Sequence, residues 1–171
     1  MAESDFRTVA VEARFGPGEK LPALELPRQN GKTAPLGGKI DRLDVFRAED
    51  GTNYVRVVDY KTGGISFDFS QAAAGMQLQL PLYLAAAANA EKNARPAAAC
   101  YGRFTDPLIE TDSRDGETIE KKIGAEMRLR GVLLDDPLAA QASEDRASLL
   151  NKDGSLRKGA GLSQRAMDGL L

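Results

Sequence analysis

Hydrophobic and polar positions alternate along several short stretches of the chain, and this pattern predicts strands. The clearest stretch is Tyr54–Lys61, which is rich in β-branched and aromatic residues and ends in charged ones. A second alternating stretch, Lys39–Phe46, precedes it, and Glu49–Asn53 between them has the composition of a tight turn. The two stretches are therefore expected to pair as neighbouring antiparallel strands.

The rest of the pattern predicts an α/β fold, with a mixed, mainly antiparallel central sheet and helices on its faces. Strands are expected over Phe6–Phe15, Leu24–Arg28, Lys32–Phe46 and Ala97–Phe104, with shorter ones over Leu108–Thr111 and Ser155–Lys158. Helices are expected from about Ser70 to Asn93, over Thr118–Arg130 and Leu138–Leu150, and over Gln164–Leu171 with Ser163 as the N-cap. Pro81 should kink the first of these helices or remove one of its backbone hydrogen bonds.

Acidic side chains stand on the two strands that are expected to pair. Asp41 lies on the first strand, Asp59 lies near the end of the second, and Lys61 follows two positions later. Because side chains alternate along a strand, Asp59 and Lys61 share one face, while Tyr60 points to the other and its backbone carbonyl can act as an oxygen ligand. Two carboxylates beside an ammonium group suit a hard cation such as Mg²⁺ and the cleavage of a phosphodiester.

The alternative for Asp59 and Lys61 is a solvated pair on the surface of a strand. The apolar run that precedes them indicates a central, partly buried strand. Charged residues at the end of such a strand cost free energy unless they pair with each other or hold a metal. The upstream Asp41 further favours the metal site.

A third motif, Gly75–Leu84, lies in the long predicted helix. Gln77 falls on one face of that helix, while Gln79 and Tyr83, four residues apart, fall on another. An exposed helix face is the alternative explanation for both glutamines.

In this order, the motifs resemble those of the RecB-like branch of the PD-(D/E)XK nucleases, and the C-terminal nuclease domain of AddB-type proteins most of all. The matching residues are Gly38-Lys-Ile-Asp-Arg-Leu-Asp44, Val57-Val-Asp-Tyr-Lys-Thr-Gly63 and Gln77-Leu-Gln-Leu-Pro-Leu-Tyr83. Three ordered motifs are more specific than one short pattern. The resemblance implies a restriction-endonuclease-like fold in a single domain, 1–171, with the core motifs in 38–104 and a less well specified helical part in 112–171.

The resemblance also implies a role for each matching residue. Asp41 and Asp59 would bind the metal together with the backbone carbonyl of Tyr60. Lys61 would be the catalytic lysine, and Gln77 would be the glutamine that sits near the active site and the DNA strand.

Tyr83 and Arg42 would support that site. The implied activity is Mg²⁺-dependent cleavage of DNA, with Mn²⁺ as a substitute, in an AddAB-type helicase–nuclease that processes double-strand breaks in repair and recombination. The implied partners are DNA and an AddA-type helicase subunit. A catalytically incomplete scaffold of the same fold and a stand-alone RecB-family nuclease are the alternatives.

Two features depart from the family pattern. Related nucleases carry a His or Glu upstream that completes the metal site, but this chain has no histidine, and Glu3 and Glu12 are the acids available there. AddB relatives hold an iron–sulfur cluster through four cysteines, whereas this chain has one, Cys100, which is expected to pack as a small buried hydrophobe. The chain is either a piece of a longer protein or a divergent relative without the cluster.

Composition agrees with one globular domain. The 171 residues are 42% hydrophobic and 28% charged, and no apolar run reaches membrane-spanning length. The net charge of −2 is not typical of a free-standing DNA-binding protein, although Arg128 and Arg130 are candidates for contact with DNA. A lone cysteine and the lack of a signal-peptide pattern indicate a reducing cytoplasm, and the resemblance implies a bacterial one.

Overall fold

The centre of the molecule is a five-stranded sheet. The computed structural model describes residues 4–29, 31–63, 67–112 and 114–158, and its sheet has the order β1-β4-β5-β6-β7. These strands are β1 (Arg7–Phe15), β4 (Gly38–Arg47), β5 (Asn53–Lys61), β6 (Ala94–Arg103) and β7 (Arg130–Leu133). Only β5 and β6 run parallel within this sheet. The predicted mixed, mainly antiparallel sheet flanked by helices is therefore confirmed.

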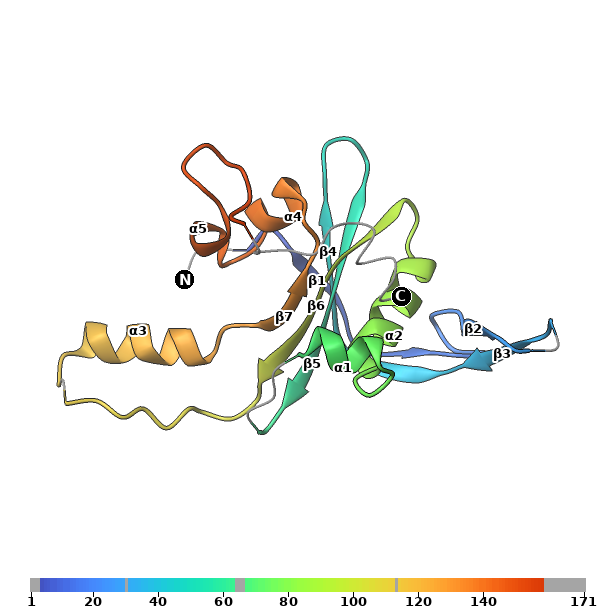
Figure 1. The fold of residues 1–171 in the computed structure, drawn as a ribbon, viewed down its shortest axis with the longest axis horizontal. Helices are drawn as coiled ribbons and strands as arrows, with labels where there is room; N and C mark the ends of the chain where they lie inside the picture. The colour runs from blue at the N-terminus through green and yellow to red at the C-terminus, as the bar shows by residue number, and fades with distance from the viewer. Residues whose placement is uncertain (1–3, 30, 64–66, 113, 159–171) are drawn as a thin grey trace.

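Helices cover both faces of the sheet (Figure 1). The parallel pairing of β5 and β6 requires a crossover, and α2 (Gln79–Ala90) provides it and buries Leu80 and Leu84 in the main core. We call the face under α2 the front face. On the opposite, back face lie α4 (Pro137–Gln141) and α5 (Arg146–Leu149).

Alternation along β5 assigns its side chains to the two faces. Val55, Val57, Asp59 and Lys61 belong to the front, and Tyr54, Arg56, Val58 and Tyr60 belong to the back. Nearly all of β5 is buried, and its exposure increases only at its two ends. The charged residues at the end of β5 therefore stand where a central strand leaves the core.

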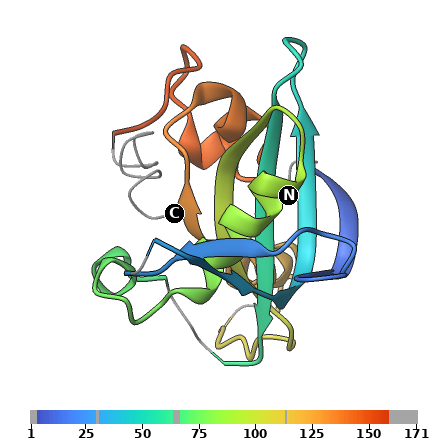
Figure 2. The same ribbon diagram turned by 90° about the vertical axis from the view of Figure 1, so that its right-hand side faces the viewer.

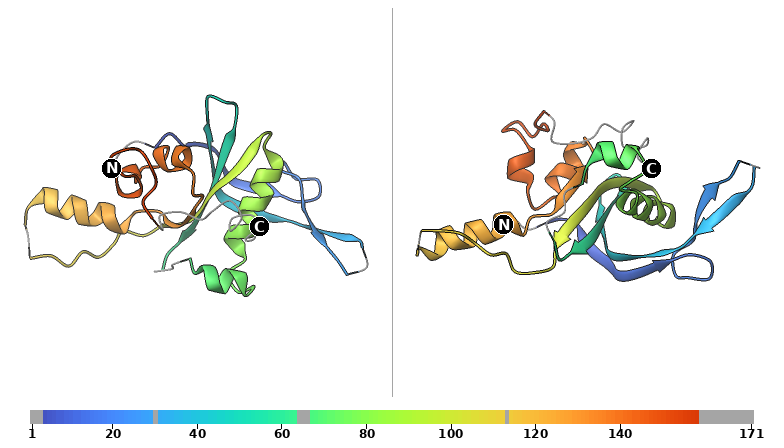
Figure 3. Two further views of the ribbon diagram at one scale, coloured as in Figure 1. Left: turned by 45° about the horizontal axis from the view of Figure 1, so that its top comes forward. Right: turned by 60° about the horizontal axis from the view of Figure 1, so that its bottom comes forward.

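Two projections extend from opposite ends of the sheet (Figure 3). One is a separate two-stranded hairpin of β2 (Leu24–Pro27) and β3 (Thr33–Leu36), which lies beside α2 in Figure 2. The other, which we call the arm, comprises the chain between β6 and β7 and contains α3 (Gly116–Glu126).

The prediction of a single long helix from Ser70 to Asn93 is wrong, because this segment contains two helices. They are α1 (Phe69–Ala73) and α2. Gly75 has a φ of 82°, a left-handed conformation that ends the first helix. Pro81 lies in the first turn of α2, where its missing N–H has no helical partner to lose, so it produces a helix start rather than a kink.

The strand predicted over Lys32–Phe46 is likewise two strands. β3 pairs with β2, and β4 pairs with β1 and β5. Gly37 separates them at a crowded point, because a Cβ there would lie 3.0 Å from the carbonyl oxygen of Phe15. β4 therefore begins at Gly38.

The second half of the chain departs most from expectation. Leu108–Thr111 forms no strand, the predicted helix over Thr118–Arg130 ends at Glu126, the helix over Leu138–Leu150 is two short helices, and Ser155–Lys158 contributes one isolated bridge at Leu156. β7 was not predicted. It pairs with β6 through Gly131, where a Cβ would lie 2.0 Å from the Ala99 carbonyl oxygen. The expected helix over Gln164–Leu171 and its N-cap lie outside the described residues.

Within the described ranges, no helix is both long and apolar enough to span a membrane.

Candidate active site

The two acidic residues of the motif strands meet on the front face, where β4 and β5 separate. Register pairing between these strands ends at Arg42 and Val58. Beyond that pair, Asp41 Oδ2 accepts a hydrogen bond from the backbone N–H of Tyr60 at 2.9 Å. The side chain of Asp41 thus replaces a ladder bond, which fixes its carboxylate beside Asp59.

Asp59 is a buried carboxylate with few partners. It is 3% exposed, its Oδ1 accepts a hydrogen bond from Gln79 Nε2 at 3.1 Å, and its Oδ2 lies 2.5 Å from the Lys61 ammonium nitrogen. Within the described part of the chain, this ion pair is the one partner of Oδ2, which accepts no well-directed hydrogen bond. A buried carboxylate oxygen in this condition suits a cation.

The charges around Asp59 do not balance. Burial raises the pKa of the Asp59 carboxyl, Lys61 lowers it in part, and the neighbouring Asp41 raises it again. Burial would lower the pKa of Lys61, but the hydrogen bond and charge of Asp59 outweigh burial and raise it. One ammonium group therefore does not offset the combined cost of burying Asp59 and placing it beside a second carboxylate.

Gln79 connects the helix to this charged group. Its Oε1 accepts a hydrogen bond from Lys61 Nζ at 3.0 Å while its Nε2 donates to Asp59. The same Nε2 donates to the Tyr83 hydroxyl at 3.1 Å, one helical turn further on. Gln79 and Tyr83, rather than Gln77, therefore form the helical part of the site.

Gln77 lies in the loop between α1 and α2. Its Oε1 accepts from the backbone N–H of Asp68 at 2.9 Å, and its Nε2 donates to Gln71. These contacts hold the loop before α2, whereas the glutamine that contacts Asp59 and Lys61 is Gln79. The role of Gln77 as the active-site glutamine therefore stays a prediction. The spacing of four between Gln79 and Tyr83 was the available signal in the sequence.

Tyr83 also packs against the start of the sheet. Its ring meets that of Phe15 edge to face, with centroids 5.9 Å apart. Gly38 leaves room for this pair, because a Cβ there would lie 2.7 Å from the Phe15 ring. Tyr83 thus supports Gln79 while fixing the angle between α2 and β4.

Arg42 and the side chain of Tyr60 lie on the back face, behind the site. Arg42 Nη1 donates to the Tyr60 hydroxyl at 2.7 Å, and its Nε and Nη2 donate to Asp44 at 2.9 and 2.8 Å. These bonds link β4 and β5 immediately behind Asp41 and Asp59. Arg42 therefore supports the site through the strands, without reaching the front face.

Asp44 is the centre of a second charged group. It also accepts hydrogen bonds from Thr8 Oγ1 at 2.8 Å and from Arg56 Nε at 2.9 Å. Burial would raise the pKa of Asp44, but the two guanidinium groups outweigh burial and hold it below its usual value. Arg56 in turn donates to Glu144 at 2.7 Å.

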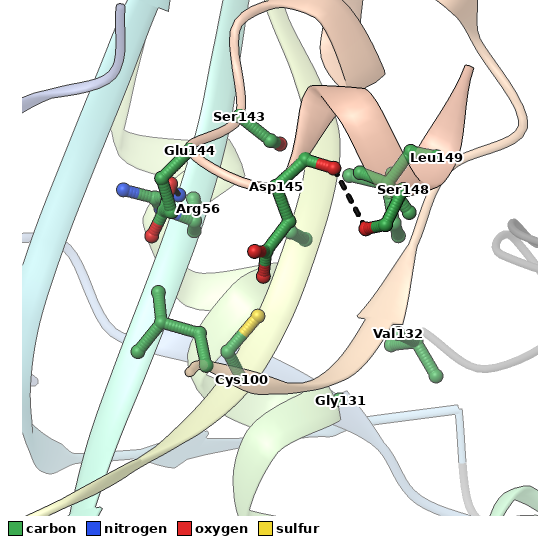
Figure 4. Close-up of a pocket in the computed structure, with 12 residues that line it drawn as sticks. Arg56, Cys100, Gly131, Val132, Ser143, Glu144, Asp145, Ser148 and Leu149 are labelled. Carbon is green, nitrogen blue, oxygen red and sulfur yellow. Dashed lines mark hydrogen bonds and ion pairs between the residues drawn. The ribbon is translucent and has the colours of Figure 1, made fainter. Parts of the chain in front are cut away.

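Cys100 lies against this back-face network. It lines a cavity of about 150 Å³ together with Arg56 and Glu144. Figure 4 shows these residues, with β6 on one side of the cavity and the segment that contains α5 on the other. Burial raises the pKa of its thiol to about 12. The expectation of a small buried hydrophobe is confirmed, and it is the only cysteine in the chain.

Glu12, the upstream acid that the structure describes, adds nothing to the site. Glu12 is exposed and pairs with Lys39 at 2.9 Å, and Glu3 lies outside the described residues. Across the described ranges, no three side chains of His, Cys, Asp or Glu are arranged so that they could hold a metal ion together. The donor set is thus two carboxylates, with the Tyr60 carbonyl as a predicted third ligand.

Comparison with known proteins gives a consistent picture. The family model of the PD-(D/E)XK nuclease superfamily matches residues 1–161. The chain is 40% identical to the B subunit of the ATP-dependent helicase/deoxyribonuclease of Moorella thermoacetica, over 98% of its length and 16% of that protein. It is 38% identical to the protein of the same name from Acetivibrio thermocellus, over 91% of this chain and 15% of the relative. The chain therefore spans about one sixth of the length of these relatives.

Proposed function

This chain belongs to the PD-(D/E)XK nuclease superfamily, and we propose that it is the DNA-cleaving domain of an AddB-type protein in a helicase–nuclease. The mixed five-stranded sheet flanked by helices is consistent with the restriction-endonuclease-like fold of that superfamily. The observation that carries the proposal is the convergence of Asp41, Asp59 and Lys61 at the point where β4 and β5 separate.

The superfamily generally uses divalent metal ions, and we propose Mg²⁺ here, with Mn²⁺ as a substitute. Asp41, Asp59 and the Tyr60 carbonyl would hold the ion, because hard cations prefer oxygen donors. The raised pKa of Asp59 and its incompletely bonded Oδ2 support a cation at this position. The ion, when bound, supplies Lewis-acid chemistry that polarises the phosphate and makes water a stronger nucleophile.

Lys61 and Gln79 have complementary roles in this proposal. Water attacks the phosphorus atom, and its oxygen forms a new bond to phosphorus as it loses a proton to solvent. The bond to the leaving oxygen breaks, and that oxygen takes a proton from solvent. The Lys61 ammonium stabilises the negative charge that develops on the phosphate oxygens. Gln79 positions Lys61 and Asp59 relative to each other, and Tyr83 holds the amide of Gln79.

The wider setting is also proposed from the relatives. Because those proteins are named as the B subunits of a helicase/deoxyribonuclease, we expect an AddA-type helicase partner, a DNA substrate, a role in double-strand break repair and a location in the bacterial cytoplasm. The net charge of −2 fits a domain that receives its DNA from other parts of a complex.

Cleavage of labelled DNA by the full-length protein tests this function. Asp59→Asn should lower the rate in Mg²⁺ by about 100-fold or more, because it removes a ligand oxygen charge, and loss of even an outer-shell partner costs 10–100-fold. Asp135→Asn, which removes the same charge at an exposed position, should leave the rate unchanged. Equal rates for Asp59→Asn and the wild type would refute the assignment.

A catalytically incomplete scaffold is the second candidate. The lack of histidine and the absence of a third acid near Asp41 and Asp59 within the described ranges favour it. A scaffold should bind no Mn²⁺ at these two carboxylates, whereas a nuclease site should bind it through both. A stand-alone nuclease would instead cleave DNA without any partner protein.

A further inference from the structure

A cluster of arginines lies beside Lys61, where the arm joins the sheet. Arg103 is the last residue of β6, Arg130 is the first residue of β7, and Arg128 lies between α3 and β7. Together with Lys61 they line one shallow depression. We call Arg103, Arg128 and Arg130 the arginine cluster. The right-hand view of Figure 3 shows the arm leaving the sheet at this end.

Acidic partners of the arginine cluster are few and loosely held. Glu126 is shared between Arg103 at 3.7 Å and Arg130 at 3.3 Å, and Arg128 pairs with Asp145 at 3.2 Å. The Arg128 and Arg130 side chains are 50% and 52% exposed. Ion pairs at such exposed positions contribute little, about 0–1 kcal/mol, so an incoming anion can replace them.

We propose that the arginine cluster binds phosphate groups of the DNA strand that leads to the bond cleaved at Asp59 and Lys61. This inference rests on the proposed function. Planar guanidinium groups match phosphate oxygens in two-point contacts. The depression has a volume of about 20 Å³, which is too small to enclose a base.

The arginine cluster would contact the backbone of the DNA strand rather than its bases. Backbone contacts of this kind fix the register of a strand and carry no base preference. Because Lys61 lines the same depression, a phosphate held by Arg103 or Arg128 would lie next to the reacting one. The arginine cluster therefore positions the strand for cleavage and does not select its sequence.

Substitution of Glu126 should change DNA affinity in the opposite direction to substitution of the arginines. The Glu126 carboxylate lies in the depression and competes with phosphate for two of the three arginines. Removal of its charge by Glu126→Gln should release Arg103 and Arg130 for the strand. A purely structural salt-bridge cluster would predict no gain in DNA binding from that change.

The experiment measures the affinity of a labelled single-stranded oligonucleotide in EDTA, over a range of salt concentrations, so that no cleavage occurs. The variants are Arg103→Gln, Arg128→Gln, Arg130→Gln and Glu126→Gln. Arg47→Gln is the matched control, because Arg47 is exposed at the opposite end of β4. Thermal unfolding of each variant confirms that it is folded.

Each arginine variant should bind more weakly than Arg47→Gln, and the slope of log K against log salt should fall by roughly 0.7 for each phosphate group that the variant no longer binds. Glu126→Gln should bind more tightly than the wild type. The inference is overturned if the three arginine variants match Arg47→Gln in affinity and slope, or if Glu126→Gln binds no more tightly than the wild type.

Failure of this inference and failure of the proposed function give different results. Equal binding by all variants, with metal-dependent cleavage that still requires Asp59, would refute only the proposed role of the arginine cluster. Weakened binding by the arginine variants, with cleavage indifferent to Asp59→Asn, would leave a nucleic-acid site without the proposed nuclease.

Discussion

Two buried aspartates, Asp44 and Asp59, lie on opposite faces of the same pair of strands and have opposite surroundings. Asp44 on the back face accepts hydrogen bonds from Thr8, Arg42 and Arg56, and its pKa is lowered. Asp59 on the front face has one amide and one ammonium partner, and its pKa is raised. Both residues are at most 3% exposed.

The difference separates a carboxylate that stabilises the fold from one that the fold tolerates. Three partners satisfy the oxygens of Asp44, so it joins β1, β4 and β5. Asp59 keeps an oxygen whose only described partner is Lys61. Burying that oxygen costs free energy, which the packing of the rest of the core offsets. A buried carboxylate with incomplete bonding is therefore the better indicator of a site than burial alone.

The largest expected effect comes from breaking the back-face group. Asp44→Ala should lower the free energy of unfolding by about 3–5 kcal/mol, because it removes one of the two carboxylates that pair with buried Arg56 and also the carboxylate that pairs with Arg42. Asp59→Asn should cause no loss of stability, because it removes a charge that burial disfavours. Denaturant unfolding of both variants measures this contrast. Equal losses in the two variants would show that the two faces do not differ in this way.

The front-face contacts can be tested with two glutamines that are close in sequence. Gln79→Leu should lower the rate of DNA cleavage by about 10–100-fold, as expected for a group that orients a metal ligand and a catalytic lysine. Gln77→Leu is the matched control and should change the rate little, because its contacts are with Asp68 and Gln71. A larger effect at Gln77 would restore the sequence-based prediction.

The pKa shifts predict opposite responses to acid. The pKa of Asp44 is lowered, so its stabilisation is complete above the usual carboxyl pKa and is lost as pH falls through the folded value. The pKa of Asp59 is raised, so it takes up a proton at higher pH than an ordinary carboxyl. Cleavage measured against pH should therefore decline on the acid side at a pH above the usual Asp value, while the fold persists.

Lys61→Met tests how far Lys61 lowers the pKa of Asp59. Removal of the ammonium should raise the pKa of Asp59 further and move the acid limb of metal binding to still higher pH. Mn²⁺ affinity measured against pH for this variant and the wild type gives the result. A shift toward lower pH would contradict the assigned role of Lys61.

The smallest effect should come from single hydroxyl groups on the two faces. Tyr60→Phe removes the bond from Arg42 and should cost about 1 kcal/mol of stability with little change in cleavage. Tyr83→Phe removes the bond to Gln79 and should lower the cleavage rate with a smaller change in stability. Thermal unfolding and cleavage rates of the two variants should therefore rank them in opposite order.

Local sequence patterns sufficed to predict that Asp41, Asp59 and Lys61 lie on two paired strands. The alternation in β4 and β5 placed Asp41, Asp59 and Lys61 on neighbouring strands, because the side-chain period of two leaves little freedom. The strands at β1 and β6 were also predicted within a few residues.

The helical part of the site could not be predicted in the same way. Whether Gln77 or Gln79 reaches Asp59 depends on where α2 begins, which the left-handed conformation of Gly75 and the position of Pro81 determine together. β7 depends on the close approach of Gly131 to Ala99, a tertiary contact that overrides local preference. The position of the arginine cluster follows from that strand.

Calorimetric titration with Mn²⁺ tests the central claim most directly. The wild-type protein should bind the ion, and Asp41→Asn and Asp59→Asn should each abolish binding while both variants remain folded. Asp135→Asn should bind as the wild type does, because its exposed carboxylate is not part of the site. Unchanged binding in Asp59→Asn would contradict the account and would show that Asp59 is buried for another reason.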